Sequence, residues 1–492
     1  MNLSRIIERH AAFTPHKVAL HFEGVDISYA ALWQRIERAT RVLLAQGVKP
    51  GDRIAYLGLN DPALFDLLFA LARIGAILLP LNFRLAPAEH EAILRHAGAG
   101  LLVADATYAA AAAQLSDAIG RKPLSTKTLG DAATGAAGPL TGTDDSPVLL
   151  VYTSGTTGKP KGALHTQANL LWNCVISTHA HDFSPADHVL TVLPLFHVGG
   201  LCIQTLPALH AGATVTLHAR FDPGAWLRDV AVRRPTMSLM VPATLRAALN
   251  HPDWAAADFS SMKLLNAGSS VIPASQIAAV HAKGVPLCQV YGSTETGPVS
   301  IYLRAEDAMA HPGSAGKAGL HVEVRLVDEH GADVPRGQVG EIRVRGLNLM
   351  RGYWNDSGNP SFQDGWFASG DLAYQDAEGF FHVVGRAKDM IISGGENVYP
   401  AELENVLADC SDILEAAVVG LEDARWGEAA VAVVVRMPGA QIDEAGVMRL
   451  FEGRLARFKH PRRIVFADAL PKTALGKVKK GTLRDELKKG AA

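Results

Sequence analysis

The 492-residue chain has few cysteines, little net charge and no long uninterrupted apolar run. Its four cysteines, Cys174, Cys202, Cys288 and Cys410, are far apart and form neither a CxxC pair nor a metal-ligand spacing, which predicts packing residues in a reducing compartment. Lys plus Arg number 47 against 49 Asp plus Glu. This balance excludes the strong basic field with which a protein grips nucleic acid or an anionic membrane.

The apolar segments are also too short and too interrupted for a membrane span. The most apolar stretch, LLFALARIGAILLPL, contains Arg73, Gly75 and Pro80 and falls short of the ~20 apolar residues that cross a bilayer. The N-terminus, MNLSRIIERH, carries Arg5 and Glu8 where a signal peptide needs an apolar core. We therefore expect a cytoplasmic protein with no integral membrane association and no nucleic-acid partner.

The order of apolar and polar segments predicts an α/β fold. From Arg53 onward, short apolar runs such as RIAYLGL and AILLPL alternate with helical patterns such as PALFDLLFALARIG, as in βαβ units. A linker-like stretch, residues 131–146, leads into the strand PVLLVYTSGTTG and a second α/β succession. After Gly316, the alternating segments HVEVRLVDEHG, GEIRVRG and FFHVVGR predict a small antiparallel sheet or barrel.

The length favours at least two domains. We predict a large N-terminal domain, residues 1–386, made of two α/β layered subdomains plus a small β-barrel-like subdomain. A small mobile α+β lid domain, residues 387–492, would follow it. In this second part we expect a helix that begins at Pro400, strands at EAAVVGL and AAVAVVV, and a helix over EAGVMRLFEGRLARF, residues 444–458.

A glycine-rich segment, YTSGTTGKPKGALHTQANL, raises the question of phosphate binding. A Walker loop needs four residues between its glycine and the GK pair, followed by Ser or Thr. Here Gly155 and Gly158 are two residues apart and Lys159 precedes Pro160, so the Walker interpretation fails. The glycines still let backbone N–H groups approach anionic oxygens, among hydroxyls and lysines. Alone, the segment is equally compatible with a surface turn.

Other motifs favour a nucleotide. VYGSTETG places Tyr291, Thr294 and Glu295 at the end of a strand, where open α/β sheets bind ligands. An aromatic ring can stack on a base, a hydroxyl can meet a phosphate, and a carboxylate can hold a hard cation. SGDLA offers Asp371 and VGRAKD offers Arg386, an acid and a base suited to a ribose and its phosphate, and LPKTALGKVKK carries Lys477 near the C-terminus.

These five motifs, in this order, resemble those of the adenylate-forming superfamily, which includes acyl-CoA synthetases, luciferases and peptide-synthetase adenylation domains. The resemblance extends from ISYAAL near the N-terminus to the final lysine loop, nearly the whole chain. It implies an AMP-forming carboxylic acid–CoA ligase. In that reaction, an acid and MgATP give acyl-AMP and pyrophosphate, and the CoA thiol then gives acyl-CoA and AMP.

The resemblance also implies roles for individual residues. Lys477 would bridge the acid carboxylate and the α-phosphate, with Thr294 and Glu295 as its catalytic partners; Glu295 and Thr156 would hold Mg²⁺. A lysine suits this position because it neutralises the two anions that the reaction brings together. Predicted ATP or AMP contacts are Thr153, Ser154, Gly155, Thr156, Thr157, Lys159, Lys161, Gly268, Ser269, Ser270, Tyr291, Gly292, Ser293, Thr294, Asp371, Val383, Arg386 and Lys477.

Two further groups follow from the resemblance. The acyl pocket would comprise His197, Val198, Gly199, Asn266, Ala267 and Gly268. We expect His197 to shape the pocket wall, because a lone histidine is more often a packing residue than an acid–base catalyst. For the second half-reaction the C-terminal domain would rotate about Lys388, withdraw Lys477 and bring ISGGENV to the site. The predicted hinge and CoA-side residues are Lys388, Ser393, Gly394, Gly395, Glu396, Trp426, Arg457 and Lys459.

The sequence leaves several alternatives open. The acceptor thiol could belong to a carrier-protein pantetheine instead of CoA, and a luciferase-like oxidase would share the adenylation site. A non-catalytic nucleotide-binding protein on the same fold would lack one of Lys477, Glu295 or Asp371, whereas all three are present. Small residues such as Gly199 and Ala267 favour an apolar acid of moderate size, either a medium-chain fatty acid or an aryl acid such as a hydroxycinnamate. A homodimer is compatible with these features.

Overall fold

The computed structural model of the chain describes residues 2–131, 138, 140–154, 160–268, 272–356, 361–393, 396–423, 425–473 and 477–489, and of Ser154 only the backbone. Predicted site residues that lie outside the described residues are Gly155, Thr156, Thr157, Lys159, Ser269, Ser270, Gly394 and Gly395. Within the described ranges, no helix has both the length and the apolar character that a membrane crossing requires.

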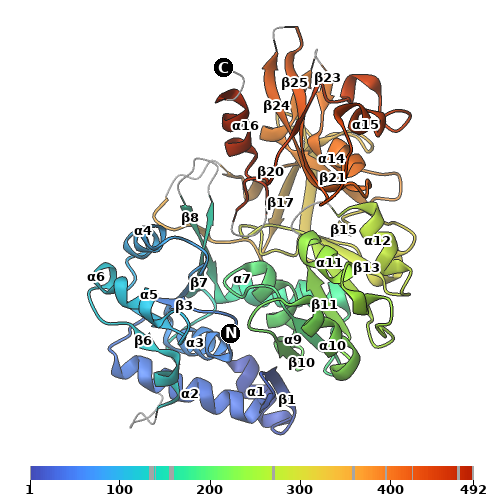
Figure 1. The fold of residues 1–492 in the computed structure, drawn as a ribbon. Helices are drawn as coiled ribbons and strands as arrows, with labels where there is room; N and C mark the ends of the chain where they lie inside the picture. The colour runs from blue at the N-terminus through green and yellow to red at the C-terminus, as the bar shows by residue number, and fades with distance from the viewer. Residues whose placement is uncertain are drawn as a thin grey trace.

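The first large sheet of the N-terminal body is mostly parallel and has helices on its faces (Figure 1). The predicted strand, helix and strand after Arg53 are present, and α3 (Pro62–Ile74) shows why it forms there. The Asp61 side chain accepts a hydrogen bond from the Ala63 N–H at its start, and Gly75 takes a left-handed conformation, φ 84°, at its end. In spatial order the seven strands are β18 (Gly352–Tyr353), β8 (Pro160–Thr166), β7 (Pro147–Ser154), β4 (Ile77–Pro80), β3 (Arg53–Leu57), β5 (Leu101–Ala104) and β6 (Leu124–Ser125).

The second large sheet has a parallel centre and antiparallel edges. Its far edge is built from β1 and β2, which precede the first sheet in the chain, so the N-terminus joins the two sheets. Sequence alternation does not reveal such a crossover. In spatial order the nine strands are β15 (Lys317–Ala318), β14 (Ile301–Tyr302), β13 (Leu287–Tyr291), β12 (Leu264–Gly268), β11 (Met237–Met240), β9 (His188–Thr191), β10 (Thr214–Leu217), β1 (Val18–Phe22) and β2 (Val25–Ser28).

The helices of this body pack on both sheets (Figure 1). Their bounds are α1 (Arg5–Phe13), α2 (Tyr29–Ala45), α4 (Pro87–Ala97), α5 (Ala109–Gln114), α6 (Ser116–Ile119), α7 (Gln167–His181), α8 (Val198–Gly200), the π-helical turn η2 (Leu201–Thr205), α9 (Leu206–His210), α10 (Pro223–Arg233), α11 (Pro242–Leu249), α12 (Ala274–His281) and α13 (Ala305–Ala308). The four cysteines are free, and three of them are buried.

A small antiparallel sheet follows, as the alternation after Gly316 predicts. Its strands are β16 (Val322–Val327), β17 (Gly340–Gly346), β20 (Trp366–Gln375), β19 (Phe362–Gln363) and β21 (Phe381–Arg386). Strand β21 ends in the short turn η4 (Ala387–Asp389), which contains the exposed Lys388. The α/β architecture with a small β subdomain is therefore confirmed.

The C-terminal part has its own sheet and its own two hydrophobic clusters. The helix predicted over residues 444–458 is too long: α15 (Glu444–Arg449) ends early and turns follow it, and Gly453 adopts φ 72°, which excludes a helix that continues through residue 453. The elements here are β22 (Ile391–Ser393), β23 (Glu396–Val398), α14 (Pro400–Ala408), β24 (Ile413–Asp423), β25 (Gly427–Arg436), β26 (Arg463–Phe466) and α16 (Lys480–Lys489). The domain boundary at 386/387 and the mobility of the lid remain predictions.

Candidate active site

The predicted nucleotide residues lie where the N-terminal sheets meet the C-terminal domain. They come from the ends of β7, β12 and β13, from the β20–β21 hairpin and from the loop that carries Lys477. In Figure 1 the C-terminal sheet, in orange and red, stands above this junction. Direct interdomain contact is made by Arg246 of α11, which donates a hydrogen bond to the backbone carbonyl of Leu414.

Tyr291, Asp371 and Arg386 form a continuous hydrogen-bonded chain. Asp371 and Arg386 are cross-strand partners on β20 and β21, and the Arg386 Nε lies 2.7 Å from Asp371 Oδ1. The Tyr291 hydroxyl donates to Asp371 Oδ2 over 2.9 Å. Burial and the negative charge of Asp371 hold the pKa of Tyr291 well above its ordinary value, so the phenol stays a donor. The structure thus brings these three residues together, although Tyr291 and Arg386 are 95 positions apart in the sequence.

The loop after β13 is held tightly against its neighbours. A Cβ at Gly292 would lie 2.3 Å from the Pro298 carbonyl oxygen, and one at Gly268 would lie 2.8 Å from the Val290 carbonyl oxygen. Glycine is therefore required at both positions. Thr294 is buried in this loop, and the Ser293 Oγ is buried with no hydrogen-bond partner in the described part of the chain. Such an orphan hydroxyl suits a phosphate oxygen.

Glu295 is held by a residue that the sequence reasoning missed. The hydroxyl of Tyr353, on β18, donates to Glu295 Oε1 over 2.8 Å. The Tyr353 ring also lies under the ammonium of Lys161, with 4.9 Å between Nζ and the ring centroid. Lys161 Nζ is 3.7 Å from Asp356 Oδ2, which completes the group. Tyr353 therefore ties the carboxylate predicted to hold Mg²⁺ to the strand that leaves the glycine-rich loop.

The carboxylate environment fits Mg²⁺. Among the described residues, no group of three or more His, Cys, Asp or Glu side chains is arranged to hold a metal ion. Mg²⁺ is commonly bound through one or two carboxylates, substrate phosphates and water, so the single oxygen site of Glu295 is sufficient. Thr156, the other predicted magnesium residue, lies outside the described residues.

Lys477 faces these groups from the other domain. Asp371 and Glu295 act on its ammonium through their negative charge, and Arg386 acts through its positive charge. Although Lys477 keeps contact with solvent, desolvation by the surrounding protein and the charge of Arg386 lower its pKa. The cationic form is therefore lost at a lower pH than for an ordinary lysine. The Thr473 N–H donates to the Lys477 carbonyl over 2.7 Å, and the Lys477 N–H donates to Thr473 Oγ1 over 3.2 Å. These two bonds hold the backbone of Lys477 to that of Thr473.

His197, predicted to line the acyl pocket, lies within the electrostatic field of Lys477. Burial, Lys477 and Arg84 lower the pKa of His197 to about 4, so its imidazole is neutral at physiological pH. A Cβ added to Gly199 would meet no atom within 4 Å, which leaves open space beside His197. Asn266 is buried in the middle of β12. Val198 and Ala267 pack into hydrophobic clusters, so their side chains face the cores of the domain.

The predicted CoA-side residues are less clearly grouped. Lys459 is engaged with Glu402, whose two oxygens lie 2.8 Å from its Nζ. Arg457 is exposed, Glu396 is exposed and Ser393 is buried. The Trp426 ring is contacted by two guanidinium groups, those of Arg425 at 4.8 Å and Arg462 at 4.7 Å. Thr153 and Val383, predicted nucleotide contacts, lie on β7 and β21, and Val383 packs against the hydrophobic cluster of the small sheet.

The contact between Tyr353 and Glu295 leads to a first prediction. A Tyr353→Phe substitution removes one hydrogen bond to a carboxylate, and the loss of such a bond costs about 1.5–3 kcal/mol. We expect the Mg²⁺ concentration needed for half-maximal ATP binding to rise about tenfold. Titration calorimetry of ATP at fixed Mg²⁺ concentrations measures this shift without turnover.

Tyr374→Phe is the matched control for Tyr353→Phe. Tyr374 is also half-buried and lies on β20, but its ring stacks on His382 with a centroid distance of 4.9 Å. This control should leave the Mg²⁺ requirement of ATP binding unchanged. An unchanged requirement in Tyr353→Phe as well would contradict the positioning role.

Comparison with known proteins shows the family of the chain. The family model described as AMP-binding enzyme matches residues 7–354, and that of the AMP-binding enzyme C-terminal domain matches residues 402–477. An indoleacetate–CoA ligase of Aromatoleum aromaticum is 46% identical over 501 residues, 98% of each chain. A feruloyl-CoA synthase of an Amycolatopsis species is 42% identical over 491 residues, 97% of each chain.

A solved structure extends the likeness to three dimensions. The o-succinylbenzoate CoA synthetase of Bacillus subtilis, in complex with its acyl-adenylate intermediate, matches with a TM-score of 0.89 and 31% identity over 98% of each chain. The resemblance inferred from the motifs is thus confirmed: the chain belongs to the AMP-binding enzyme family, within the adenylate-forming superfamily.

Proposed function

We propose that the protein is an AMP-forming carboxylic acid–CoA ligase that acts on an aryl acid. The observation that carries this proposal is the convergence of Lys477 on Asp371, Arg386 and Glu295 across the domain junction. This arrangement would put a cation where a carboxylate and a triphosphate have to approach each other. A protein that only stored or sensed nucleotides would have no need for such a cation from a second domain.

In the first half-reaction, the acid carboxylate attacks the α-phosphate of ATP and pyrophosphate leaves. Lys477 would lie between the two anions and stabilise the charge that gathers on the phosphorus oxygens. Thr294 and the orphan hydroxyl of Ser293 would receive phosphate oxygens, and Tyr291 would lie against the adenine. Mg²⁺, held by Glu295 and the phosphates, would neutralise charge on the leaving pyrophosphate. No protein nucleophile is needed, because positioning and electrostatics suffice.

In the second half-reaction, a thiol attacks the acyl-adenylate carbonyl and AMP leaves. Lys477 is not needed in this step. Rotation of the C-terminal domain about Lys388 would withdraw it and bring residues 392–398 toward the adenylate. We propose CoA as the thiol donor because the relatives similar over the whole chain are named CoA ligases. A carrier-protein pantetheine is the alternative acceptor, since both carry the same thiol arm.

An aryl acid is favoured over a fatty acid for two reasons. The two curated relatives described above are named for indoleacetate and ferulate, which are both flat aromatic acids. In addition, the buried carboxamides of Gln204 and Asn266 lie behind the proposed pocket wall, where an extended alkyl chain would meet polar groups. We further propose a cytoplasmic location, which suits four free cysteines, and the homodimer remains a prediction.

The proposed reaction is tested by AMP release from the purified protein. We expect AMP only when MgATP, an aryl acid and CoA are all present, with cinnamic, benzoic, arylacetic and medium-chain fatty acids compared. Pyrophosphate release without CoA-dependent AMP release would point to a carrier-protein thiol. No reaction with any acid would contradict the proposed function.

The role of Lys477 can be separated from the second step. Lys477→Ala should lower the rate of adenylate formation at least ~10²-fold, as does removal of one preorganised charge-stabilising group. Thioester formation from synthetic acyl-AMP and CoA should remain near that of the unaltered enzyme. Lys479→Ala, an exposed lysine two residues away, is the control and should leave both steps intact. Equal loss of both steps in Lys477→Ala would contradict this division.

The hinge prediction concerns the turn between the two domains. Lys388→Pro fixes φ at residue 388 and restricts Ala387, which limits the rotation that the second step needs. We expect adenylate formation to persist and thioester formation to fall sharply, while Lys388→Ala retains both. Single-turnover assays of each half-reaction measure this, and an undiminished thioester step in Lys388→Pro would place the hinge elsewhere.

A further inference from the structure

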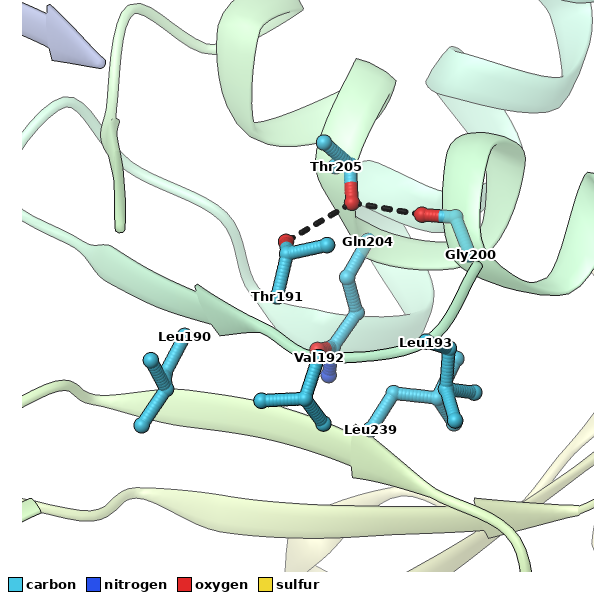
Figure 2. Close-up of a pocket in the computed structure, with 8 residues that line it drawn as sticks. All are labelled: Leu190, Thr191, Val192, Leu193, Gly200, Gln204, Thr205 and Leu239. Carbon is cyan, nitrogen blue, oxygen red and sulfur yellow. Dashed lines mark hydrogen bonds between the residues drawn. The ribbon is translucent and has the colours of Figure 1, made fainter. Parts of the chain in front are cut away.

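A small buried cavity lies directly behind the segment that carries His197. Its volume is about 10 Å³, and its walls include Val192, Leu193, Gly200 and Leu239 (Figure 2). A cavity of this size holds about one water-sized atom group. Gly200 closes α8, which begins directly after His197, so the cavity borders the proposed acyl side of the active site.

Gln204 presents an unsatisfied hydrogen-bond acceptor in this cavity. The side chain is 2% exposed and lines the cavity from the turn η2. Its Nε2 donates to Asn266 Oδ1 over 2.6 Å and to the Ser238 carbonyl over 3.4 Å. Its Oε1 is buried and has no hydrogen-bond partner among the described residues. A buried amide oxygen without a donor is unfavourable unless a ligand or water supplies one.

The orientation of the Gln204 amide is fixed by its neighbours. Asn266 uses its Nδ2 to donate to the Cys288 carbonyl over 3.3 Å, which leaves its Oδ1 as the acceptor facing Gln204. Reversing the Gln204 amide would bring its oxygen against two other oxygens, Asn266 Oδ1 and the Ser238 carbonyl. The nitrogen must therefore face these acceptors, and Oε1 is the atom left for a donor.

The other polar side chains at the cavity are already satisfied. Thr205 Oγ1 bonds with Thr191 Oγ1 over 2.8 Å and donates to the Gly200 carbonyl over 2.6 Å. Figure 2 shows these two bonds and the Gln204 side chain, which extends from the helical turn toward the strand that carries Val192. Gln204 is thus the cavity-lining side chain, among the described residues, whose acceptor atom is unpaired.

We propose that the carboxamide oxygen of Gln204 accepts a hydrogen bond from an N–H or O–H group at the far end of the aryl acid. The inference rests on the proposed function and deepens it by naming a feature of the substrate. Gly199, where an added Cβ would meet no atom within 4 Å, directly precedes the cavity-lining Gly200, and the cavity volume of about 10 Å³ suits a single donor heavy atom. The site would therefore select acids with a distal donor over isosteric acids that lack one.

The test compares matched acids. Indole-3-acetate and 1-benzothiophene-3-acetate differ in the ring N–H, and 4-hydroxycinnamate and cinnamate differ in the O–H. We take the pair that the unaltered enzyme turns over faster. For that pair, we expect kcat/KM of AMP release with MgATP and CoA to be at least ~10-fold higher for the donor acid in the unaltered enzyme. In Gln204→Leu the ratio should fall to about one or reverse. Gln204→Met, which keeps the side-chain length, repeats the test if Gln204→Leu does not fold.

Gln276→Leu is the matched control. Gln276, on α12, is also buried with an unpaired Oε1, but it does not line the cavity. This variant should keep the preference of the unaltered enzyme for the donor acid. If both Gln204 variants kept the preference of the unaltered enzyme for the donor acid, the assignment would be overturned. It would also be overturned if the unaltered enzyme turned over both acids of a pair without preferring the donor acid. If the unaltered enzyme turned over neither member of either pair or any other aryl acid, the proposed function itself would fail, and this inference with it.

Discussion

The electrostatic constraint on which the site depends is that two anions have to meet in one place. A carboxylate approaches a triphosphate only if positive charge lies between them. The low dielectric of a partly closed site strengthens both the repulsion between the two anions and their attraction to the cation. In the proposed reaction Lys477 would supply this charge from the C-terminal part of the chain, while Asp371, Arg386 and Glu295 lie in the N-terminal part. The proposed catalytic arrangement therefore depends on the packing of these two parts against each other.

The N-terminal half of the arrangement is made rigid by strand pairing. Asp371 and Arg386 face each other because β20 and β21 pair in one register, and a slip of one residue would turn one of them to the opposite face. Tyr353 reaches Glu295 because β18 pairs with β8, which brings it beside the strand that leaves the glycine-rich loop. In both cases regular secondary structure sets the positions of the charged groups, which is more accurate than placement by loops alone.

The proposed acyl pocket is bordered by neutral groups, in contrast to the charged groups on the nucleotide side. His197 is neutral because burial and two cations lower its pKa to about 4, so in the proposed acyl pocket it would add shape and no charge. Behind it, Gln204 and Asn266 form a buried amide pair in otherwise apolar surroundings. Buried amides are tolerated when they are hydrogen-bonded, and one atom left unpaired marks a place where a ligand can complete the network. Charge thus directs the chemistry at one end of the site, while a neutral polar group is available for recognition at the other.

Much of this protein was determined by the sequence alone. Apolar runs of strand length, helix-starting prolines and ordered motifs around Glu295, Asp371 and Lys477 carry local or near-local signals, and they predicted the α/β class and the nucleotide chemistry. The early end of α15 was missed because Gly453 breaks a pattern that is otherwise helical. Only the tertiary structure decided that Tyr353 holds Glu295, that the N-terminal strands join the second sheet, and that Gln204 has an unpaired oxygen. These features arise from contacts between residues distant in the chain, and no periodicity or short motif records such contacts.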